Sequence, residues 1–442
     1  MTVPSLAVQR DPRYERWRWT ILAVTWVAYV GFYFTRKSFA VAKVGLLDDP
    51  VMGLDKSAMG VIDLGYGIAY AIGQFLCGMW CDRVGSRRVV LAGMIASIAA
   101  AVAMGLSTDR VLFGLLFFAQ GLCQSAGWAP LTKNVSNWFS RRERGRVFGL
   151  WSTNYAIGGV LASAAAGFAA LHFGGWRYAF LVPPAALALI ALAFFVWQRN
   201  RPEDAGLPPI DQYHGEPAGP LPTAETKESA AAPGGAFAMF RLVLANPMIL
   251  RLGVIYFLLK PIRYALLFWG PLIIHERIKT DIGQTAFISA FFEAAGPVGV
   301  VLAGWASDRL FGARRIPVIV IGLAGLAVIL FSFNAITATQ SRLATILVLA
   351  GIGCFLFGPD SLIVSTSAVD FAGKDGAGSA TGFINGMGST GQILGLSLPG
   401  FISERYGWDA LFTGMGCFIT LAVLLLAPSW NVVSAPARGH SR

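Results

Sequence analysis

The sequence GMWCDRVGSRR at residues 78–88 returns, with one residue inserted, as GWASDRLFGARR at residues 304–315. Gly304 lies 226 positions after Gly78, and the acid and the basic cluster of the motif follow at nearly the same interval. A motif of this length that recurs once in a long chain indicates a unit that is written twice. In membrane proteins, candidate binding sites gather where two such repeats meet near the bilayer midplane.

The composition predicts a membrane protein built from helices. Of the 442 residues, 55% are hydrophobic and 13% are charged, and such a chain contains apolar runs that reach the about 20 residues needed by one transmembrane helix. These runs exceed the about ten residues of a membrane β-strand, so we expect an all-α fold with about twelve transmembrane helices. Their expected ranges are 19–43, 58–80, 89–106, 111–134, 147–171, 178–197, 248–274, 284–306, 316–337, 343–367, 378–403 and 409–428.

We expect the chain to have three parts. Residues 1–197 form one six-helix bundle, residues 247–442 form a second, pseudo-symmetric bundle, and residues 198–246 form a cytoplasmic linker. The linker is rich in proline, glycine and charged residues, and such a composition does not bury a core.

Basic residues predict the orientation in the membrane. Arginines gather at residues 83–88, 141–146 and 309–315, in loops that follow expected helices. Because cytoplasmic loops carry an excess of Lys and Arg, we place these loops and both termini in the cytoplasm, in a bacterial inner membrane. The net charge of +11 then reflects topology and does not indicate nucleic-acid binding. We expect no cleavable signal peptide.

Other residue types give no indication of an enzyme or of a cofactor. The four histidines lie without Cys or carboxylate companions at ligand spacing, so we expect no metal. The five cysteines lie in or beside expected helices, which makes structural disulfides unexpected. No nucleophile, base and orienting group converge in the sequence, so we expect no catalytic residues.

Two arginines lie inside apolar segments. Arg36 lies in TWVAYVGFYFTRKSFAVA at residues 25–42, and Arg263 lies in GVIYFLLKPIRYALLFWGPLII at residues 253–274. A charged side chain at the bilayer centre costs at least about 2.5 to 3.5 kcal/mol, so each arginine must face a cavity or a partner. A guanidinium binds a phosphate or a carboxylate through two hydrogen bonds and stays charged at accessible pH. We therefore expect an anion site.

The alternative is that each arginine pairs with an internal acid, such as Asp63 or Glu293. We favour an anionic ligand, because the repeat relates the two arginines and few acids lie near them in the sequence. Aromatic residues of the expected helices can contribute donors to the same site, although such stripes more often serve packing. The candidates are Tyr29, Tyr33, Tyr66, Tyr70, Trp128 and Tyr155, together with Asn154.

A lysine accompanies each arginine. Lys37 follows Arg36, and Lys260 precedes Arg263 by three positions, which places it on a similar helix face. Glu293 is the expected internal counter-ion; it could equally carry a proton, because loss of hydration raises the pKa of a carboxyl.

The doubled loop motif resembles that of the Major Facilitator Superfamily, whose fold is two six-helix bundles that open alternately to either side of the membrane. By this resemblance, Asp82, Arg83, Asp308 and Arg309 act in a conformational gate. The alternative is that these residues only anchor the topology.

Further motifs resemble the organophosphate:phosphate antiporters, the family of the glycerol-3-phosphate, hexose-phosphate and phosphoglycerate carriers and the glucose-6-phosphate transporter. The resemblance covers nearly the whole chain. It implies an exchanger in which Arg36 and Arg263 clamp a phosphate, with Lys37 and Glu293 in a charge network between the halves. The motifs are FYFTRKSFA at 32–40, GLCQSAGWAP at 121–130, WFSRRERG at 138–145, FEAAG at 292–296 and ATGF at 380–383.

Several positions depart from that pattern. Gln74 stands where several members have a lysine, and Lys260 stands where the glycerol-3-phosphate carriers have a tyrosine, so we expect Lys260 to restore the missing charge. Tyr155 replaces a histidine and Phe268 replaces an acid of those carriers. The resemblance therefore does not identify the organic part of the substrate.

The expected function is the exchange of a phosphate monoester for inorganic phosphate across the lipid bilayer, by a monomer. One alternative is a proton-coupled symporter of an organic anion or phosphonate that cycles protons on Glu293 or Asp63. Another is a membrane sensor of sugar phosphates.

Overall fold

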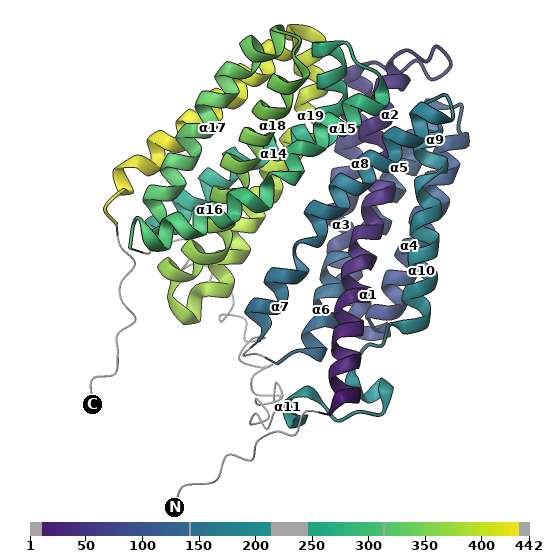
Figure 1. Ribbon diagram of the computed structural model, residues 1–442, viewed down its shortest axis with the longest axis vertical. Helices are drawn as coiled ribbons and strands as arrows, with labels where there is room; N and C mark the ends of the chain where they lie inside the picture. Colours follow the sequence, from purple (N-terminus) through teal and green to yellow (C-terminus); the bar gives the residue numbers. More distant parts are fainter. Residues whose placement is uncertain (1–10, 141–142, 214–245, 313, 433–442) are drawn as a thin grey trace, which may run out of the picture.

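The computed structural model describes residues 11–140, 143–213, 246–312 and 314–432. Over these ranges every regular element is a helix, so the all-α prediction is confirmed. The helices form two bundles that lean against each other, the first drawn in purple to teal and the second in green to yellow (Figure 1).

Several crossings of the first bundle are broken helices. Lys37 separates α1 from α2, residues 125–127 separate α5 from α6, and residues 152–153 separate α7 from α8. The first bundle comprises α1 (Pro12–Arg36), α2 (Ser38–Leu47), α3 (Lys56–Val84), α4 (Ser86–Leu106), α5 (Arg110–Gln124), α6 (Trp128–Trp138), α7 (Arg144–Trp151), α8 (Asn154–His172), α9 (Tyr178–Leu181) and α10 (Pro183–Trp197).

The second bundle also contains a broken helix, at Ala295 between α15 and α16, and its first helix, α14, is longer than α1. It comprises α14 (Pro247–Ile278), α15 (Ile282–Ala294), α16 (Gly296–Arg309), α17 (Arg315–Ala338), α18 (Arg342–Ser361), the π-helical turn η2 (Leu362–Ser367), α19 (Ala368–Leu426) and the short η3 (Ala427–Ser429).

The long element α19 contains two membrane crossings. Gly407 has φ +79°, a conformation that residues with a Cβ rarely adopt, and it marks the turn between them. Directly after Gly407, the Trp408 indole donates to Glu276 near the end of α14. After the turn the chain returns to the start of α14, where Ser429 accepts a hydrogen bond from Arg251.

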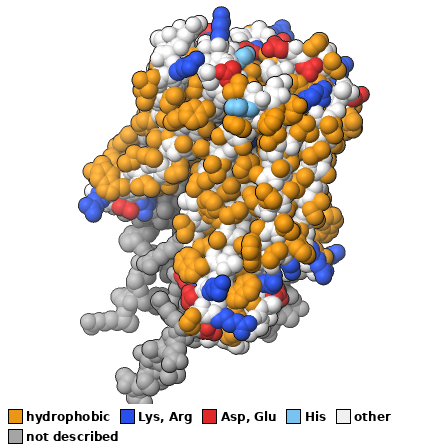
Figure 2. Space-filling model, turned by 45° about the vertical axis from the view of Figure 1, so that its right-hand side comes forward, with side chains coloured by type: hydrophobic (Ala, Val, Ile, Leu, Met, Phe, Trp, Pro, Cys, Tyr) orange, Lys and Arg blue, Asp and Glu red, His pale blue; other side chains and the backbone are white. Residues whose placement is uncertain are grey.

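The surface is that of a membrane-spanning protein. Nine stretches of the described residues are long and apolar enough to cross a membrane, and the one at Phe383–Ser429 holds both crossings of α19. The α1–α2 segment and α3, which carry more tyrosines and charges, are not among the nine. Together these segments agree with the twelve expected helices. Hydrophobic side chains cover the middle of the molecule, and charged ones gather towards its two ends (Figure 2).

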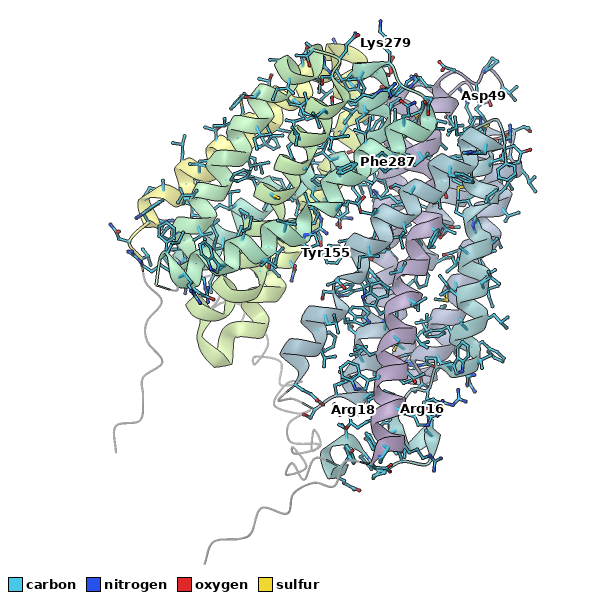
Figure 3. The ribbon with its side chains drawn as sticks, viewed as in Figure 1. Arg16, Arg18, Asp49, Tyr155, Lys279 and Phe287 are labelled. Carbon is cyan, nitrogen blue, oxygen red and sulfur yellow. The ribbon has the colours of Figure 1, made fainter. Side chains whose placement is uncertain are left out.

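The two halves meet mainly towards one end of the molecule, the end that carries Asp49 and Lys279 (Figure 3). There α3 packs on α19, and α8 packs on α15. Glycine permits the close approach, because a Cβ at Gly60 would lie 2.8 Å from the Ser397 carbonyl oxygen. An ion pair of 2.8 Å between Lys56 and Glu276 also joins the halves at this end.

The beginning of the expected linker is folded. A 3₁₀ turn η1 (Pro202–Ala205) and α11 (Ile210–Tyr213) pack against the start of α1. The Tyr213 ring stacks on the Tyr14 ring with centroids 3.9 Å apart, and the Tyr14 hydroxyl donates to the Pro208 carbonyl at 3.0 Å. The remainder of the linker, 214–245, lies outside the described residues.

Candidate functional site

A cavity of about 610 Å³ lies between the two halves. It sits at the depth of Tyr155, midway between the two ends of the molecule (Figure 3). All of the residues expected to bind substrate line it except Asn154. The lining residues are Tyr29, Tyr33, Arg36, Tyr66, Tyr70, Gln74, Trp128, Ser152, Tyr155 and Ala156 from the first half, and Tyr256, Lys260, Arg263, Tyr264, Leu267, Phe268, Glu293, Phe357, Asp360, Ser361, Val364, Asn385, Ser389 and Gln392 from the second.

Arg36 forms one wall of the cavity. It is the last residue of α1, at the break before α2. Its guanidinium carbon lies 4.8 Å from the ring centroid of Tyr33 and 5.2 Å from that of Tyr70, in two cation–π contacts. The residue is 8% exposed, and its Nη2 has no hydrogen-bond partner. None of the carboxylates with described side chains forms an ion pair with Arg36, so none of them offsets its charge.

Gln124, at the end of α5, orients this arginine. Its Oε1 accepts from Arg36 Nε at 2.7 Å and from the Tyr66 hydroxyl at 3.2 Å. Its Nε2 donates to Thr35 Oγ1 at 2.9 Å, which fixes the direction of the amide. The sequence motif around residue 124 contained this glutamine, but no pattern predicted its role.

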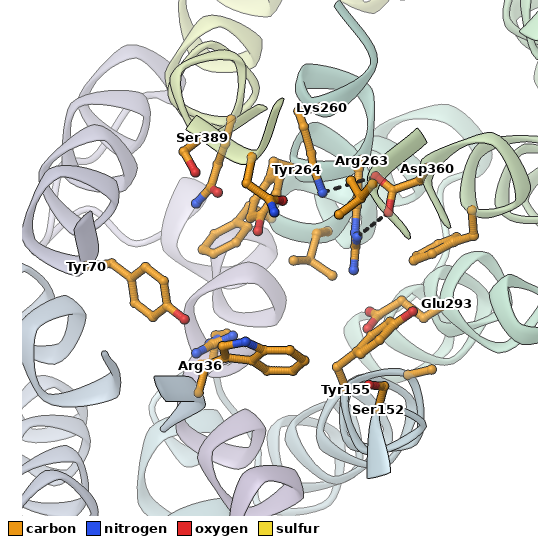
Figure 4. Close-up of a pocket in the computed structure, with 18 of the residues that line it drawn as sticks. Arg36, Tyr70, Ser152, Tyr155, Lys260, Arg263, Tyr264, Glu293, Asp360 and Ser389 are labelled. Carbon is orange, nitrogen blue, oxygen red and sulfur yellow. Dashed lines mark hydrogen bonds and ion pairs between the residues drawn. The ribbon is translucent and has the colours of Figure 1, made fainter. Parts of the chain in front are cut away.

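The opposite wall carries a charge cluster on α14 and α18 (Figure 4). Arg263 Nη1 donates to Asp360 Oδ2 at 3.1 Å, and Lys260 Nζ lies 3.0 Å from Asp360 Oδ1. The expectation that few acids lie near the arginines was therefore wrong for Arg263. Asp360 is distant from Arg263 in the sequence, but the fold brings the end of α18 to the middle of α14. Lys260 shares the Asp360 carboxylate with Arg263, so these three side chains together carry a net charge of +1.

Arg263 also faces the first half. Its guanidinium carbon lies 5.2 Å from the ring centroid of Tyr155 on α8 and 4.6 Å from that of Phe357 on α18. These two rings stack with centroids 6.4 Å apart. The second arginine thus lies at the interface of the two halves, across the cavity from Arg36 (Figure 4).

Lys37 and Glu293 form a buried ion pair between the halves. Lys37 Nζ also donates to the Leu267 carbonyl of α14 at 3.0 Å. This carbonyl lacks its usual partner within the helix, because the residue four positions later is Pro271, which has no N–H. The structure thus places this predicted pair beside the cavity.

A second buried ion pair joins Lys43 of α2 to Asp63 of α3. Both side chains are fully buried, and Lys43 Nζ donates to the Phe268 carbonyl at 3.0 Å. Neither acid named as an alternative partner of the arginines, Asp63 or Glu293, is paired with one. Lys43 was not among the residues expected from the sequence.

The expected gate residues lie at the other end of the molecule. Asp308 pairs with Arg315 at 2.5 Å within its own half. Arg83 and Arg309 are exposed at the ends of α3 and α16. The side chain of Asp82 lies outside those described.

The charges around the cavity do not cancel. Four cations and two carboxylates with described side chains line it or pair with its lining, which leaves a net charge of +2. The cations are Arg36, Lys37, Lys260 and Arg263, and the carboxylates are Glu293 and Asp360. Such a cavity favours an anion with about two negative charges.

Comparison with known proteins decides the family. The model of the Major Facilitator Superfamily matches residues 25–395, most of the chain. The chain belongs to the Major Facilitator Superfamily. A solved protein of similar fold is a bacterial homologue of the human lysosomal transporter Spinster, in an inward-facing and unoccupied conformation. Its TM-score is 0.69 at 15% identity, over 95% of this chain and 96% of that one. This superfamily fold agrees with the expected two six-helix bundles.

Within the superfamily, the chain is similar to proteins named as transporters of phosphate esters and to a protein named as a membrane sensor. It is 30% identical to a probable hexose phosphate transport protein of Chlamydia muridarum, over 97% of this chain and 94% of the relative. It is 32% identical to the membrane sensor protein UhpC of Escherichia coli strain K12, over 95% and 94%. A glycerol-3-phosphate transporter of Bacillus subtilis is 28% identical over 95% and 94%. The resemblance to the organophosphate carriers is confirmed.

Proposed function

We propose that this superfamily member exchanges a phosphate monoester for inorganic phosphate, and that Arg36 and Arg263 bind the phosphate group from opposite walls of the cavity. The observation that carries the proposal is Arg36, a nearly buried cation on the cavity wall for which the described residues supply no carboxylate. Hydrogen bonds between a guanidinium and a phosphate are charge-assisted and can be bidentate, so such a site favours phosphate over neutral solutes.

The charge of the ligand matches the charge of the cavity. A phosphate monoester carries about −1.5 to −2 near neutral pH, close to the net charge of +2 around the cavity. The names of the relatives support the same class of ligand, since hexose phosphate and glycerol-3-phosphate are both phosphate monoesters.

The orientation and the movement follow from the fold. We place both termini in the cytoplasm of a bacterial inner membrane, because the basic loops lie at the end where α1 begins; Arg18 there donates to the Trp138 carbonyl at 3.2 Å. The halves, expected at 1–197 and 247–442, are then closed towards the outside. Substrate exchange requires them to rock about the cavity, as one monomer.

Exchange is favoured over net movement. When the carrier changes state without a ligand, Arg36 must cross a closed intermediate with its charge uncompensated, and leaving a buried charge unpaired costs about 3 to 5 kcal/mol. A bound phosphate removes that cost. The loaded carrier therefore changes state faster than the empty one.

Counterflow in proteoliposomes tests the proposal. Uptake of labelled phosphate should require phosphate or a phosphate monoester inside the vesicles. It should fall at least tenfold in Arg36→Lys, because an ammonium cannot replace the planar guanidinium, and it should persist in Arg110→Lys, a matched change at an exposed arginine outside the cavity. Uptake that is indifferent to the internal anion, or that survives Arg36→Lys, contradicts the proposal.

A sensor is the second candidate, favoured by the 32% identity to the membrane sensor protein UhpC. A sensor would bind phosphate esters at the same arginines but show no flux in the counterflow assay. Proton-coupled symport has less support, because both candidate proton carriers, Glu293 and Asp63, are held in ion pairs with lysines. Uptake driven by a pH gradient into empty vesicles would select it.

A further inference from the structure

Asp360 is a carboxylate in the wall of a cavity proposed to bind an anion. It lies near the end of α18, immediately after Pro359, and is 9% exposed. Its two oxygens face Lys260 and Arg263 of α14 (Figure 4). A site for phosphate alone would gain affinity without this acid, because like charges repel. Its presence requires an explanation beyond phosphate binding.

The acid fixes how much positive charge the second half offers. With Asp360, Lys260 and Arg263 together contribute a net charge of +1 to this wall; without it they would contribute +2. The cavity as a whole would then change from a net charge of +2 to +3. With Asp360, the positive charge of the site thus balances a single phosphate group. It does not balance a ligand that carries a second acid.

The neighbouring wall carries neutral polar groups. Asn385 and Ser389 are four residues apart on one face of α19, line the cavity and are exposed there, and Gln392 follows on the same face. Hydroxyl groups of a ligand can exchange hydrogen bonds with such side chains and can donate to Asp360. A second carboxylate in this position meets the Asp360 charge, and the cation beside it, Lys260, is already paired with that acid.

We infer that Asp360 is a specificity-determining residue that restricts the substrate to phosphate monoesters whose organic part carries hydroxyl groups and no second negative charge. The inference rests on the proposed function. In this arrangement the phosphate lies between Arg36 and Arg263, and the organic part extends towards Asp360 and the α19 face with Asn385 and Ser389.

Competition of phosphate exchange by two three-carbon esters tests it. Glycerol 3-phosphate has a neutral organic part, and 3-phosphoglycerate replaces one end with a carboxylate. In proteoliposomes loaded with phosphate, the unaltered protein should be inhibited by glycerol 3-phosphate at a concentration at least tenfold lower than by 3-phosphoglycerate. Equal inhibition by the two esters overturns the inference without any variant.

The variants identify the residue responsible. Asp360→Asn should move the ratio of the two inhibition constants at least tenfold towards 3-phosphoglycerate, and Asp360→Glu, which keeps the charge, should retain most of the original preference. A ratio unchanged in Asp360→Asn, or altered equally in both variants, overturns the assignment. Absence of any phosphate exchange in the unaltered protein contradicts the proposed function instead, so the two failures are distinguishable.

Discussion

Arg36 is a cation that the membrane environment should reject, and the structure shows what makes it tolerable. The guanidinium lies against the rings of Tyr33 and Tyr70 and donates to Gln124. These contacts hold the arginine in place but leave its charge uncompensated, since an amide oxygen and aromatic faces are neutral. We propose that a bound phosphate compensates the remaining charge.

Gln124→Glu should therefore inactivate the site without removing either arginine. The new carboxylate would lie where Oε1 lies now, 2.7 Å from Arg36 Nε, and would act as a permanent internal anion. We expect phosphate affinity to fall by more than tenfold, about 1.4 kcal/mol. Equilibrium binding of labelled phosphate to the purified protein measures this. Gln340→Glu, the same change at an exposed position between α17 and α18, is the control and should bind normally.

The sequence predicted the arginines better than their partners. Arg36 and Arg263 stand out because charge inside an apolar run is rare, and this signal needs no structure. Asp360 and Lys43 carry the same signal but were overlooked, since Asp360 follows a Gly-Pro pair and Lys43 lies near an expected helix end. Which cation meets which acid depends on the rotation of each helix about its axis, and apolar runs buried on all sides give no period that fixes it.

At the scale of elements, a proline in α14 creates the docking point for the first half. Pro271 leaves the Leu267 carbonyl without its intrahelical donor, and Lys37 donates a hydrogen bond to that carbonyl instead. Lys43 donates to the next carbonyl, that of Phe268. Two lysines of one half thus donate to adjacent backbone carbonyls of the other. These contacts lie on the side of the cavity where the halves are closed.

Pro271→Ala should loosen that closure. The restored N–H can donate to the Leu267 carbonyl and compete with Lys37. Spin labels are placed at Val51 and Lys279 in a background without native cysteines. Electron paramagnetic resonance should then show a larger population of long distances between the two labels. Pro247→Ala, at the first position of the same helix where no intrahelical bond is lost, should leave the distribution unchanged. An unaltered distribution in Pro271→Ala would show that the freed carbonyl does not stabilise the closed side.

The expected helix ranges agree with the elements, but their breaks do not follow from the sequence. Apolar length predicted the crossings, whereas the interruptions at residues 125–127 and 152–153 contain no proline or charged residue that would mark them in the sequence. The packed turn at residues 202–213 was expected as linker because its composition is polar. A single aromatic stack, that of Tyr14 and Tyr213, helps to hold it to the first bundle.

At the scale of the whole molecule, the doubled loop motif predicted the architecture. Two copies of one unit imply two halves with a site between them, and the cavity lies there. Its chemistry is asymmetric, however. The first half supplies an arginine among aromatic rings, and the second supplies an arginine shared with an acid and a lysine. A repeat predicts where the site lies and not how its two walls differ.

Both termini should lie in the cytoplasm, and reporter fusions test this. A periplasmic alkaline phosphatase fused after Asp49, at the end that carries Lys279, should be active, and one fused after Arg199, which contacts Trp17 near the start of α1, should be inactive. A fluorescent protein should fluoresce when it is fused after Arg199 and should not fluoresce when it is fused after Asp49. Phosphatase activity at Arg199 and none at Asp49 would invert the proposed orientation and direction of transport.

The binding of inorganic phosphate to the purified protein, followed by titration calorimetry, tests the central claim most directly, because it does not depend on whether the protein transports or senses. We predict saturable binding of one phosphate per chain that glycerol 3-phosphate displaces, that is lost in Arg36→Lys and in Arg263→Lys, and that persists in Arg110→Lys. Equal binding by the unaltered protein and the two cavity variants would contradict the assignment of the phosphate site to the arginine pair.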